Sequence, residues 1–153
     1  MSEPTLHFDE QGAPLQDADL DAFEQRVGVR LPIEYRSFLK MHNGGRVEPS
    51  TLCMEAGAYS TGHIQYFLSI GPPMNVEPKW EMFKDPARAR MPPEHIPIAK
   101  CEGGDYLTLV VDGPKRGQIF YWNHEEEADE AYTYDNLYFV AASLDDLLAG
   151  LHD

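Results

Sequence analysis

The sequence predicts an α+β domain with a central, mainly antiparallel sheet, N-terminal helices and a C-terminal helix packed on it. Helical periodicity occurs near both ends of the chain, and the middle holds short strand-like runs separated by Gly, Pro and Asp. Helices that flank a run of sequential strands are typical of α+β folds. Because 153 residues suffice for one hydrophobic core, we expect a single domain over residues 1–153, with its core at roughly 17–152.

Two helices are expected in the first third of the chain. In residues 17–27 the apolar side chains repeat at i, i+3 and i+7, and Gly28 follows as a stop signal. In residues 31–45, Pro32 suits the first turn of a helix, and Asn43-Gly44-Gly45 supplies glycine for a left-handed C-cap. We therefore expect the second helix to end at this Asn-Gly-Gly segment.

The middle of the chain is expected to consist mostly of strands. Ile64, Tyr66 and Leu68 alternate with other residues, which predicts a strand with these three side chains on one face. A short helix is expected within 75–84, where apolar residues recur at helical spacing. Turn-rich loops then separate three strands that predict an antiparallel meander, namely 96–101, 106–111 and 118–122.

A C-terminal helix is predicted after Ser143, whose hydroxyl can cap its first turn. An apolar stripe suited to docking on the sheet follows at Leu144, Leu147, Leu148 and Leu151. We expect the helices to lie on one side of the sheet. Trp80 and Trp122 are expected to be core anchors, because aromatic side chains bury large areas.

The chain carries a strong excess of acid. Its 26 Asp and Glu residues against 12 Lys and Arg residues give a formal net charge of −14. Such a field repels phosphate backbones and attracts cationic partners, so nucleic-acid binding is not expected. Two interpretations remain open at this point, a basic protein partner or an acidic surface that serves solubility alone.

The sequence also predicts a compartment. No run approaches the roughly 20 apolar residues of a membrane span, and the N-terminus lacks the basic and apolar regions of a signal peptide. We therefore expect a cytoplasmic protein without membrane association. Cys53 and Cys101 form no C-x-x-C motif, so both are expected to be buried, reduced thiols.

Two stretches of the sequence carry a family resemblance. The first comprises Leu31-Pro32, Tyr35, Phe38-Leu39 and Asn43-Gly44-Gly45, and the second comprises Ile96-Pro97-Ile98-Ala99, Gly103-Gly104-Asp105 and Tyr121-Trp122-Asn123-His124-Glu125. In order and spacing they resemble the two signatures of the SUKH superfamily, which includes fungal cell-wall-synthesis regulators and many bacterial immunity proteins. The resemblance implies an α+β domain without known catalysis. For the immunity proteins it implies direct binding to toxins encoded beside them, many of which are nucleases.

The residues themselves predict no catalytic or cofactor site. The histidines are scattered, the segment 124–128 does not match H-E-x-x-H, and no nucleophile elbow is present. Glu102 and Asp105 flank a turn, where we expect solvated carboxylates rather than a catalytic pair. His124 follows Trp122 at strand spacing, so we expect it on the face of the indole, as a structural or surface hydrogen-bonding group. No enzyme activity, metal or cofactor is expected.

The feature that is hardest to assign to folding is the acidic run 125–130. Such a run is usually a solvated loop, but it would also suit a basic partner surface. Together with the resemblance, it predicts an immunity protein, monomeric or weakly dimeric, that occludes a basic toxin, most simply a nuclease. The alternative is a regulatory or scaffolding domain of the fungal cell-wall-regulator type. The candidate toxin-binding residues are Tyr59, Tyr66, Glu125, Glu126, Glu127, Asp129 and Glu130.

Overall fold

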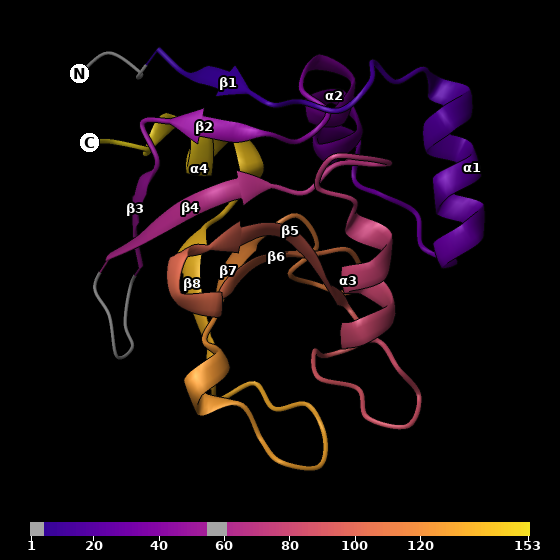
Figure 1. Ribbon diagram of the computed structural model, residues 1–153. Coiled ribbons are helices and arrows are strands. Elements are labelled where there is room, and N and C mark those ends of the chain that lie inside the picture. Colours follow the sequence, from indigo (N-terminus) through magenta and orange to yellow (C-terminus); the bar gives the residue numbers. More distant parts are fainter. Residues whose placement is uncertain (1–4, 55–60) are drawn as a thin grey trace.

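The computed structural model describes residues 5–54 and 61–153, and Figure 1 shows the order of the helices and strands along them. The elements are β1 (His7–Asp9), α1 (Asp17–Val27), α2 (Ile33–Met41), β2 (Arg46–Glu48), β3 (Thr51–Cys53), β4 (Thr61–Phe67), α3 (Val76–Phe83), β5 (His95–Cys101), η1 (Glu102–Gly104), β6 (Tyr106–Val110), β7 (Ile119–Trp122), η2 (His124–Glu126), β8 (Leu137–Ala141) and α4 (Leu144–Ala149), where η marks a 3-10 helix. No helix in this part of the chain has the length and apolar character needed to cross a membrane.

The strands form a meander that curls toward closure. Within the described residues, β3 to β8 lie side by side in sequence order, and each neighbouring pair is antiparallel. The β1–β2 ribbon joins β4 through a bridge between Gly45 and Phe67, and Thr51 of β3 bridges His152 beyond α4. These pairings satisfy backbone groups that open sheet edges would leave exposed. The α+β class with a mainly antiparallel sheet is confirmed.

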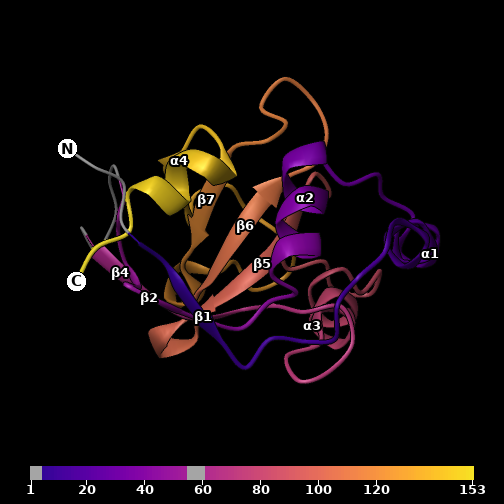
Figure 2. The same ribbon diagram turned by 90° about the horizontal axis from the view of Figure 1, so that it is seen from above.

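Helices α1, α2 and α4 cover one face of the sheet. Figure 2 shows α2 and α4 lying over β5 to β7, with α1 outside α2. Because side chains alternate along a strand, Leu107 and Leu109 of β6 and Ile119 and Tyr121 of β7 point into this layer. There they form one core with helix residues such as Leu39.

Helix α3 connects the two faces of the sheet. Val76 and Trp80 belong to the main core, whereas Phe83 at the end of the helix belongs to a second buried cluster. The other buried members of that cluster are Met91, Tyr106 and Trp122. The expectation that helices lie on one side is therefore correct for α1, α2 and α4 and wrong for the end of α3.

The two N-terminal helices have their predicted positions, but α2 ends differently. Gly28 is left-handed, with φ 73°, and caps α1 as predicted. Helix α2 stops at His42, which is extended, so Gly44 and Gly45 do not form its C-cap. Both glycines have positive φ and bring the chain close to β4, where a Cβ at Gly44 would lie 2.8 Å from the carbonyl oxygen of Phe67. The two glycines therefore allow the chain to pass close to β4, and they do not cap α2.

The predicted meander and C-terminal helix are also confirmed, with one error in register. A bulge lies between Ile64 and Tyr66 of β4, so Phe67 and Leu68 are both buried and the expected alternation fails. The short β1 to β3 and the half-buried β8 were not predicted. Ser143 caps α4, since its Oγ accepts a hydrogen bond from the backbone N–H of Asp146 at 3.1 Å.

Both tryptophans are buried as predicted, and Trp122 has no exposed surface. Trp122→Ala should lower the free energy of unfolding by about 3–5 kcal/mol, because truncating a fully buried indole leaves a cavity. The matched control is Met82→Ala on the solvent side of α3, where 40% of the residue is exposed; it should change stability by less than about 0.5 kcal/mol. Denaturant titration followed by circular dichroism measures both. Equal midpoints for the two variants would place Trp122 outside the core.

Candidate functional site

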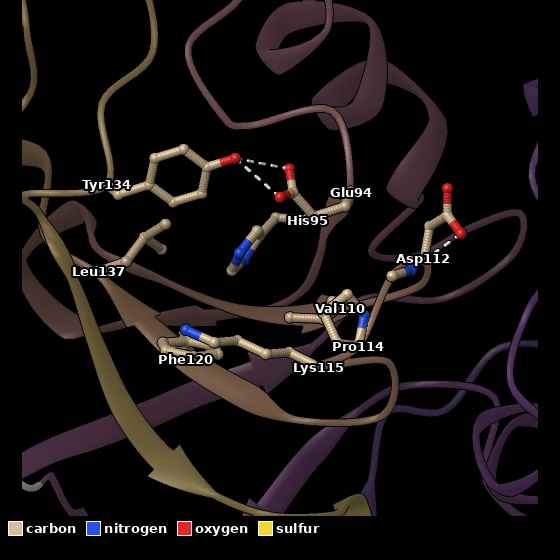
Figure 3. A pocket seen from close by; sticks show the side chains of 10 residues that line it. Glu94, His95, Val110, Asp112, Pro114, Lys115, Phe120, Tyr134 and Leu137 are labelled. Atoms are coloured by element: carbon tan, nitrogen blue, oxygen red, sulfur yellow. Dashed lines mark hydrogen bonds between the residues drawn. The ribbon is translucent and has the colours of Figure 1, made fainter.

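A cavity of about 470 Å³ lies on the sheet face opposite α1, α2 and α4 (Figure 3). It is lined by apolar side chains from three adjacent strands and by polar side chains from β5 and the surrounding loops. The apolar ones are Val110, Phe120 and Leu137, and the polar ones include Glu94, His95, Lys115 and Tyr134. The volume falls within the roughly 300–1,000 Å³ that ligand pockets occupy. We call this side of the sheet the open face.

Strand alternation determines which side chains reach the open face. In β7, Ile119 and Tyr121 point into the main core, so Phe120 between them points the other way. In β5, Ile96 belongs to the main core, and the preceding His95 lines the cavity. The sheet itself therefore provides the floor of the cavity, and rigid strands hold its aromatic side chains in place.

A row of aromatic rings crosses the open face. Tyr132 and Tyr134 form an edge-to-face pair with ring centroids 6.0 Å apart. The row continues through His95, 6.3 Å from Tyr134 and 5.2 Å from Phe120, to Phe139, 5.9 Å beyond. The two tyrosines are 39% and 52% exposed. Exposed tyrosines beside a cavity are typical of the anchor residues of protein–protein interfaces.

Glu94 fixes Tyr134 at the rim of the cavity. The Tyr134 hydroxyl donates to both carboxylate oxygens of Glu94, at 2.7 and 3.0 Å (Figure 3). Partial burial raises the pKa of Glu94, but the Tyr134 hydrogen bond, the Glu94 backbone and the charge of Lys84 lower it overall. The same hydrogen bond is the main reason that the pKa of Tyr134 rises to about 12. Glu94 therefore supplies a negative charge at neutral pH.

His95 forms an uncharged part of the cavity wall. The residue is 4% exposed, and its Nδ1 lies 2.9 Å from the hydroxyl of Thr108. Burial lowers the pKa of His95 to about 4, and the charges of Lys84 and Lys115 act in the same direction against the opposing effect of Glu94. The imidazole is thus uncharged at pH 7 and presents an aromatic surface to the cavity.

The acidic run divides into anchored and exposed residues. Glu127 accepts two hydrogen bonds from the guanidinium of Arg90, at 2.6 and 3.1 Å, and Arg88 donates to the backbone carbonyls of the next two residues. Glu126 accepts a hydrogen bond from the Tyr138 hydroxyl at 2.5 Å. The carboxylate-bearing residues that are exposed at the surface are Glu125, Glu126, Asp129 and Glu130. The run is therefore held as a defined acidic edge at the Trp122 end of the sheet, and Tyr132 and Tyr134 follow it along the chain.

The two tyrosines proposed from the sequence are placed differently. Tyr66 on β4 is half-buried and packs against the main core, and the guanidinium of Arg46 lies 6.0 Å from its ring centroid. It does not line the cavity. Tyr59 lies outside the described residues. Among the tyrosines, Tyr134 lines the cavity, whereas Tyr66 lies apart on β4.

Asp105 and His124 form a polar network at the turn after β5. Asp105 is 3% exposed and accepts hydrogen bonds from the Tyr121 hydroxyl at 2.6 Å and from the His124 N–H at 2.9 Å, while His124 Nδ1 lies 2.5 Å from its carboxylate. The expectation of solvated carboxylates is wrong for Asp105, although Glu102 is exposed. Because β7 ends at Trp122, His124 turns toward the side of Tyr121, and the prediction that it shares the face of the indole is also wrong.

The two cysteines differ in environment. Cys101 is buried as predicted, and burial raises the pKa of its thiol. Cys53 is exposed, contrary to the prediction, because alternation along β3 turns Leu52 inward instead. Across residues 5–54 and 61–153, no group of three His, Cys, Asp or Glu side chains is placed to hold a metal ion.

Sequence reasoning missed the residues that build the open face. His95, Phe120 and Tyr134 lie outside the family signatures or between their better-defined parts. One signal was available, since Phe120 and Trp122 alternate with Ile119 and Tyr121, which gives the strand two apolar faces. A strand that is apolar on both faces needs a partner for each of them.

These observations define a single α+β domain whose nearly closed antiparallel sheet carries helices mainly on one face and a cavity on the other. Comparison with models of protein families matches residues 14–150 to the SMI1 / KNR4 family (SUKH-1). The match spans most of the 153-residue chain, and the protein belongs to this family. The resemblance of its two motif regions to the SUKH superfamily is thereby confirmed. A search of curated proteins gives no match.

The neutral state of His95 predicts a defined pH dependence of stability. The pKa is about 4 in the folded protein and 6.5 for an ordinary histidine, so the unfolded chain binds the additional proton between these values. Stability from this residue is complete above pH 6.5 and should fall by roughly 3 kcal/mol as the pH drops to 4. His95→Gln should remove this component, so its free energy of unfolding should fall less steeply than that of the wild type over this range.

Denaturant titrations at several pH values measure the effect. His7→Gln is the matched control, because it makes the same substitution at a histidine whose side chain is 74% exposed. Its titration should retain the wild-type slope. Parallel curves for wild type and His95→Gln would show that His95 is solvated in the folded protein.

Proposed function

We propose that the protein is an immunity protein that binds a cognate toxin through its open face and occludes it. Membership of the SMI1 / KNR4 family supports this, because the SUKH superfamily includes many bacterial immunity proteins. The observation that carries the proposal is the exposed pair Tyr132 and Tyr134 beside the cavity of the open face, on the segment that follows the acidic run 125–130.

The charge of this surface supports a basic nuclease as the toxin. A nuclease holds a polyphosphate and therefore carries a cationic active-site surface. The exposed carboxylates of Glu125, Glu126, Asp129 and Glu130 offer that surface negative charges in place of phosphates. Complementary charge accelerates encounter more than it deepens affinity, so the acidic edge would act mainly on the association rate.

Affinity in this proposal comes from the aromatic row. A few aromatic side chains commonly carry most of the free energy of a protein interface. Tyr134 is held by Glu94, and Tyr132 packs on Tyr134, so both are ordered before a partner binds. An ordered anchor loses little conformational entropy on binding, which favours a tight complex.

Inhibition is proposed to occur by occupancy, without turnover, metal or cofactor. The proposed setting is the cytoplasm, where a monomer or weak dimer would meet the toxin directly. The alternative is a regulatory or scaffolding interaction domain of the fungal cell-wall-regulator type, because membership of the family is compatible with both. A neighbouring reading frame for a basic toxin would favour the immunity function.

Co-expression tests the proposal. Cells that express the toxin encoded beside this protein should regain growth when they also express the protein, and Tyr134→Ala should reduce this rescue. Tyr66→Ala, on a half-buried tyrosine that does not line the cavity, is the matched control and should rescue fully once its folded yield is verified. Growth arrest that persists with soluble protein present would contradict the immunity function.

Binding without turnover predicts a stoichiometric dose response. In a nuclease assay with purified components, cleavage should fall linearly with added protein and reach its floor near one equivalent. Preincubation for longer times should leave the endpoint unchanged. Complete loss of toxin activity at a small fraction of an equivalent, growing with time, would indicate a catalytic mechanism instead.

Neutralising the acidic edge should slow association. Replacing Glu125, Glu126, Asp129 and Glu130 by their amides should reduce the association rate with the toxin about tenfold at low salt, while dissociation changes little. The difference should close at high ionic strength, where screening shortens the Debye length. Stopped-flow binding at two salt concentrations measures this. Glu127 is left unchanged because it pairs with Arg90.

A second quadruple variant controls for total charge. It removes the same number of carboxylates from other parts of the surface, at Asp9, Glu34, Glu48 and Asp153. Its association rate should stay much closer to that of the wild type. Equal slowing in both variants would assign the effect to net charge, and equal rates in all three proteins would assign the acidic edge to solubility.

A further inference from the structure

We propose that the cavity on the open face receives an arginine side chain of the partner, and that Lys115 occupies part of this position in the free protein. The inference deepens the proposed function and rests on it for the identity of the partner as a basic protein. It names the chemistry of the group that enters the cavity, a planar guanidinium flanked by aromatic rings and paired with a carboxylate.

The walls of the cavity match such a group. Phe120 forms the floor, and His95 and Tyr134 present two further rings within the same cavity (Figure 3). The carboxylate of Glu94 lies at the rim, on the side of the Tyr134 hydroxyl. A guanidinium stacks on aromatic faces and pairs with carboxylates through several N–H donors. Each of its requirements therefore has a counterpart in the cavity.

The charges of the residues that line the cavity favour a positively charged group over an uncharged one. Glu94 has a lowered pKa and stays ionised, whereas His95 has a pKa of about 4 and is uncharged, so the wall does not repel a positive group. Asp112 adds a second carboxylate at the edge of the cavity. The one cation among the described lining residues is Lys115, which belongs to the exposed loop between β6 and β7.

Lys115 already shows where a positive charge is stabilised. Its ammonium lies 5.7 Å from the centroid of the Phe120 ring. In the described part of the chain it forms no ion pair within 4.0 Å. A lysine held by a ring alone is weakly held, because an exposed cation–π contact is a weak interaction. A guanidinium that also reaches Glu94 would displace it.

The chain contains the same arrangement in a completed form. Arg90 lies 4.9 Å from the ring centroid of Phe83 and 5.5 Å from that of Trp122, and its guanidinium makes two hydrogen bonds to the carboxylate of Glu127. Aromatic faces and one carboxylate thus hold an arginine at the Trp122 end of the sheet. The cavity offers rings and a carboxylate of the same kind, and a partner would supply the arginine.

The test uses two peptides and the full chain. A Gly-Ser peptide with one central arginine and an otherwise identical peptide with citrulline are titrated into the 15N-labelled protein, and amide shifts are followed by NMR. Citrulline keeps the planar shape and loses the charge. The arginine peptide should cause saturable shifts at His95, Phe120 and Tyr134, and the citrulline peptide should bind at least several-fold more weakly.

Variants identify the groups that hold the arginine. Glu94→Gln should weaken binding of the arginine peptide about tenfold, because a charge-assisted hydrogen bond is lost. Lys115→Met keeps the length of the side chain and removes its charge, so it should strengthen binding about threefold. Glu48→Gln, on strand β2 outside the cavity, is the matched control and should leave the affinity unchanged. Lys115 is exposed, so its replacement does not threaten folding.

Equal binding of the two peptides, or an unchanged affinity in both Glu94→Gln and Lys115→Met, would overturn the arginine site. These outcomes are separate from the growth assay. Failure of growth rescue with intact arginine binding would reject the immunity function and keep the site. Growth rescue by a protein that does not distinguish the peptides would keep the function and reject the site.

Discussion

The alternation of side chains along β6 and β7 is the constraint on which the rest of the molecule depends. Leu107, Leu109 and Ile119 point toward α2 and α4 and form the main core. Residues between them, such as Thr108 and Phe120, must then point to the other side. Among the described residues, α3 and the following loop cover that side at one end, where they supply Phe83 and Met91. Over the rest of the open face, loop residues such as Lys115 and Tyr134 form the walls of the cavity, where the described residues supply no helix.

Ion pairs between basic and acidic side chains determine on which part of the surface the negative charge of the protein is concentrated. Arg36 lies within 4.0 Å of carboxylates of Asp17, Asp21 and Glu24, and Arg26 pairs with Glu77. Among these ion pairs, the exposed one between Arg26 and Glu77 contributes little to stability, about 0–1 kcal/mol. Their main consequence is that much of the positive charge is matched on the helical side of the molecule. The acidic edge at 125–130 retains exposed carboxylates.

Sequence reasoning reached the features that have a local cause. Helix α1 ends at Gly28 because only glycine adopts its left-handed conformation easily, and α4 begins at Ser143 because its hydroxyl caps the first turn. The turns of the meander were predictable for the same reason. Features with a distant cause were not. Gly44 looks like a helix cap until the close approach of β4 is known, and the bulge after Ile64 depends on pairing with β5.

The candidate site likewise combines features that have a local cause in the sequence with features that depend on distant contacts. The acidic run 125–130 is visible in the sequence, but the pairing of Glu127 with Arg90 joins residues 37 positions apart. Likewise, Glu94 and Tyr134 are 40 positions apart, and the strands that they precede, β5 and β8, begin at opposite ends of the sheet. They meet because the segment before β8 reaches back across the open face to Glu94. Burial of Asp105 depends on Tyr121 and His124, which a turn motif alone does not reveal. The sequence pattern shows where acidic residues are concentrated along the chain. Tertiary contacts determine which of their carboxylates remain exposed.

The combination of an aromatic row and a large negative charge has a further physical consequence. Exposed tyrosines such as Tyr132 and Tyr134 beside an apolar cavity would favour association between copies of the same chain. Two copies that approach through their open faces would also bring together two chains that each carry a net charge of −14. Like-charge juxtaposition costs several kcal/mol at an interface, so the charge opposes self-association at the very surface where aromatic contact would promote it. A basic partner gains from both terms at once. In the proposed function, the excess of acid would thus contribute to selectivity in two ways, by opposing contact between copies of the chain and by attracting a basic partner.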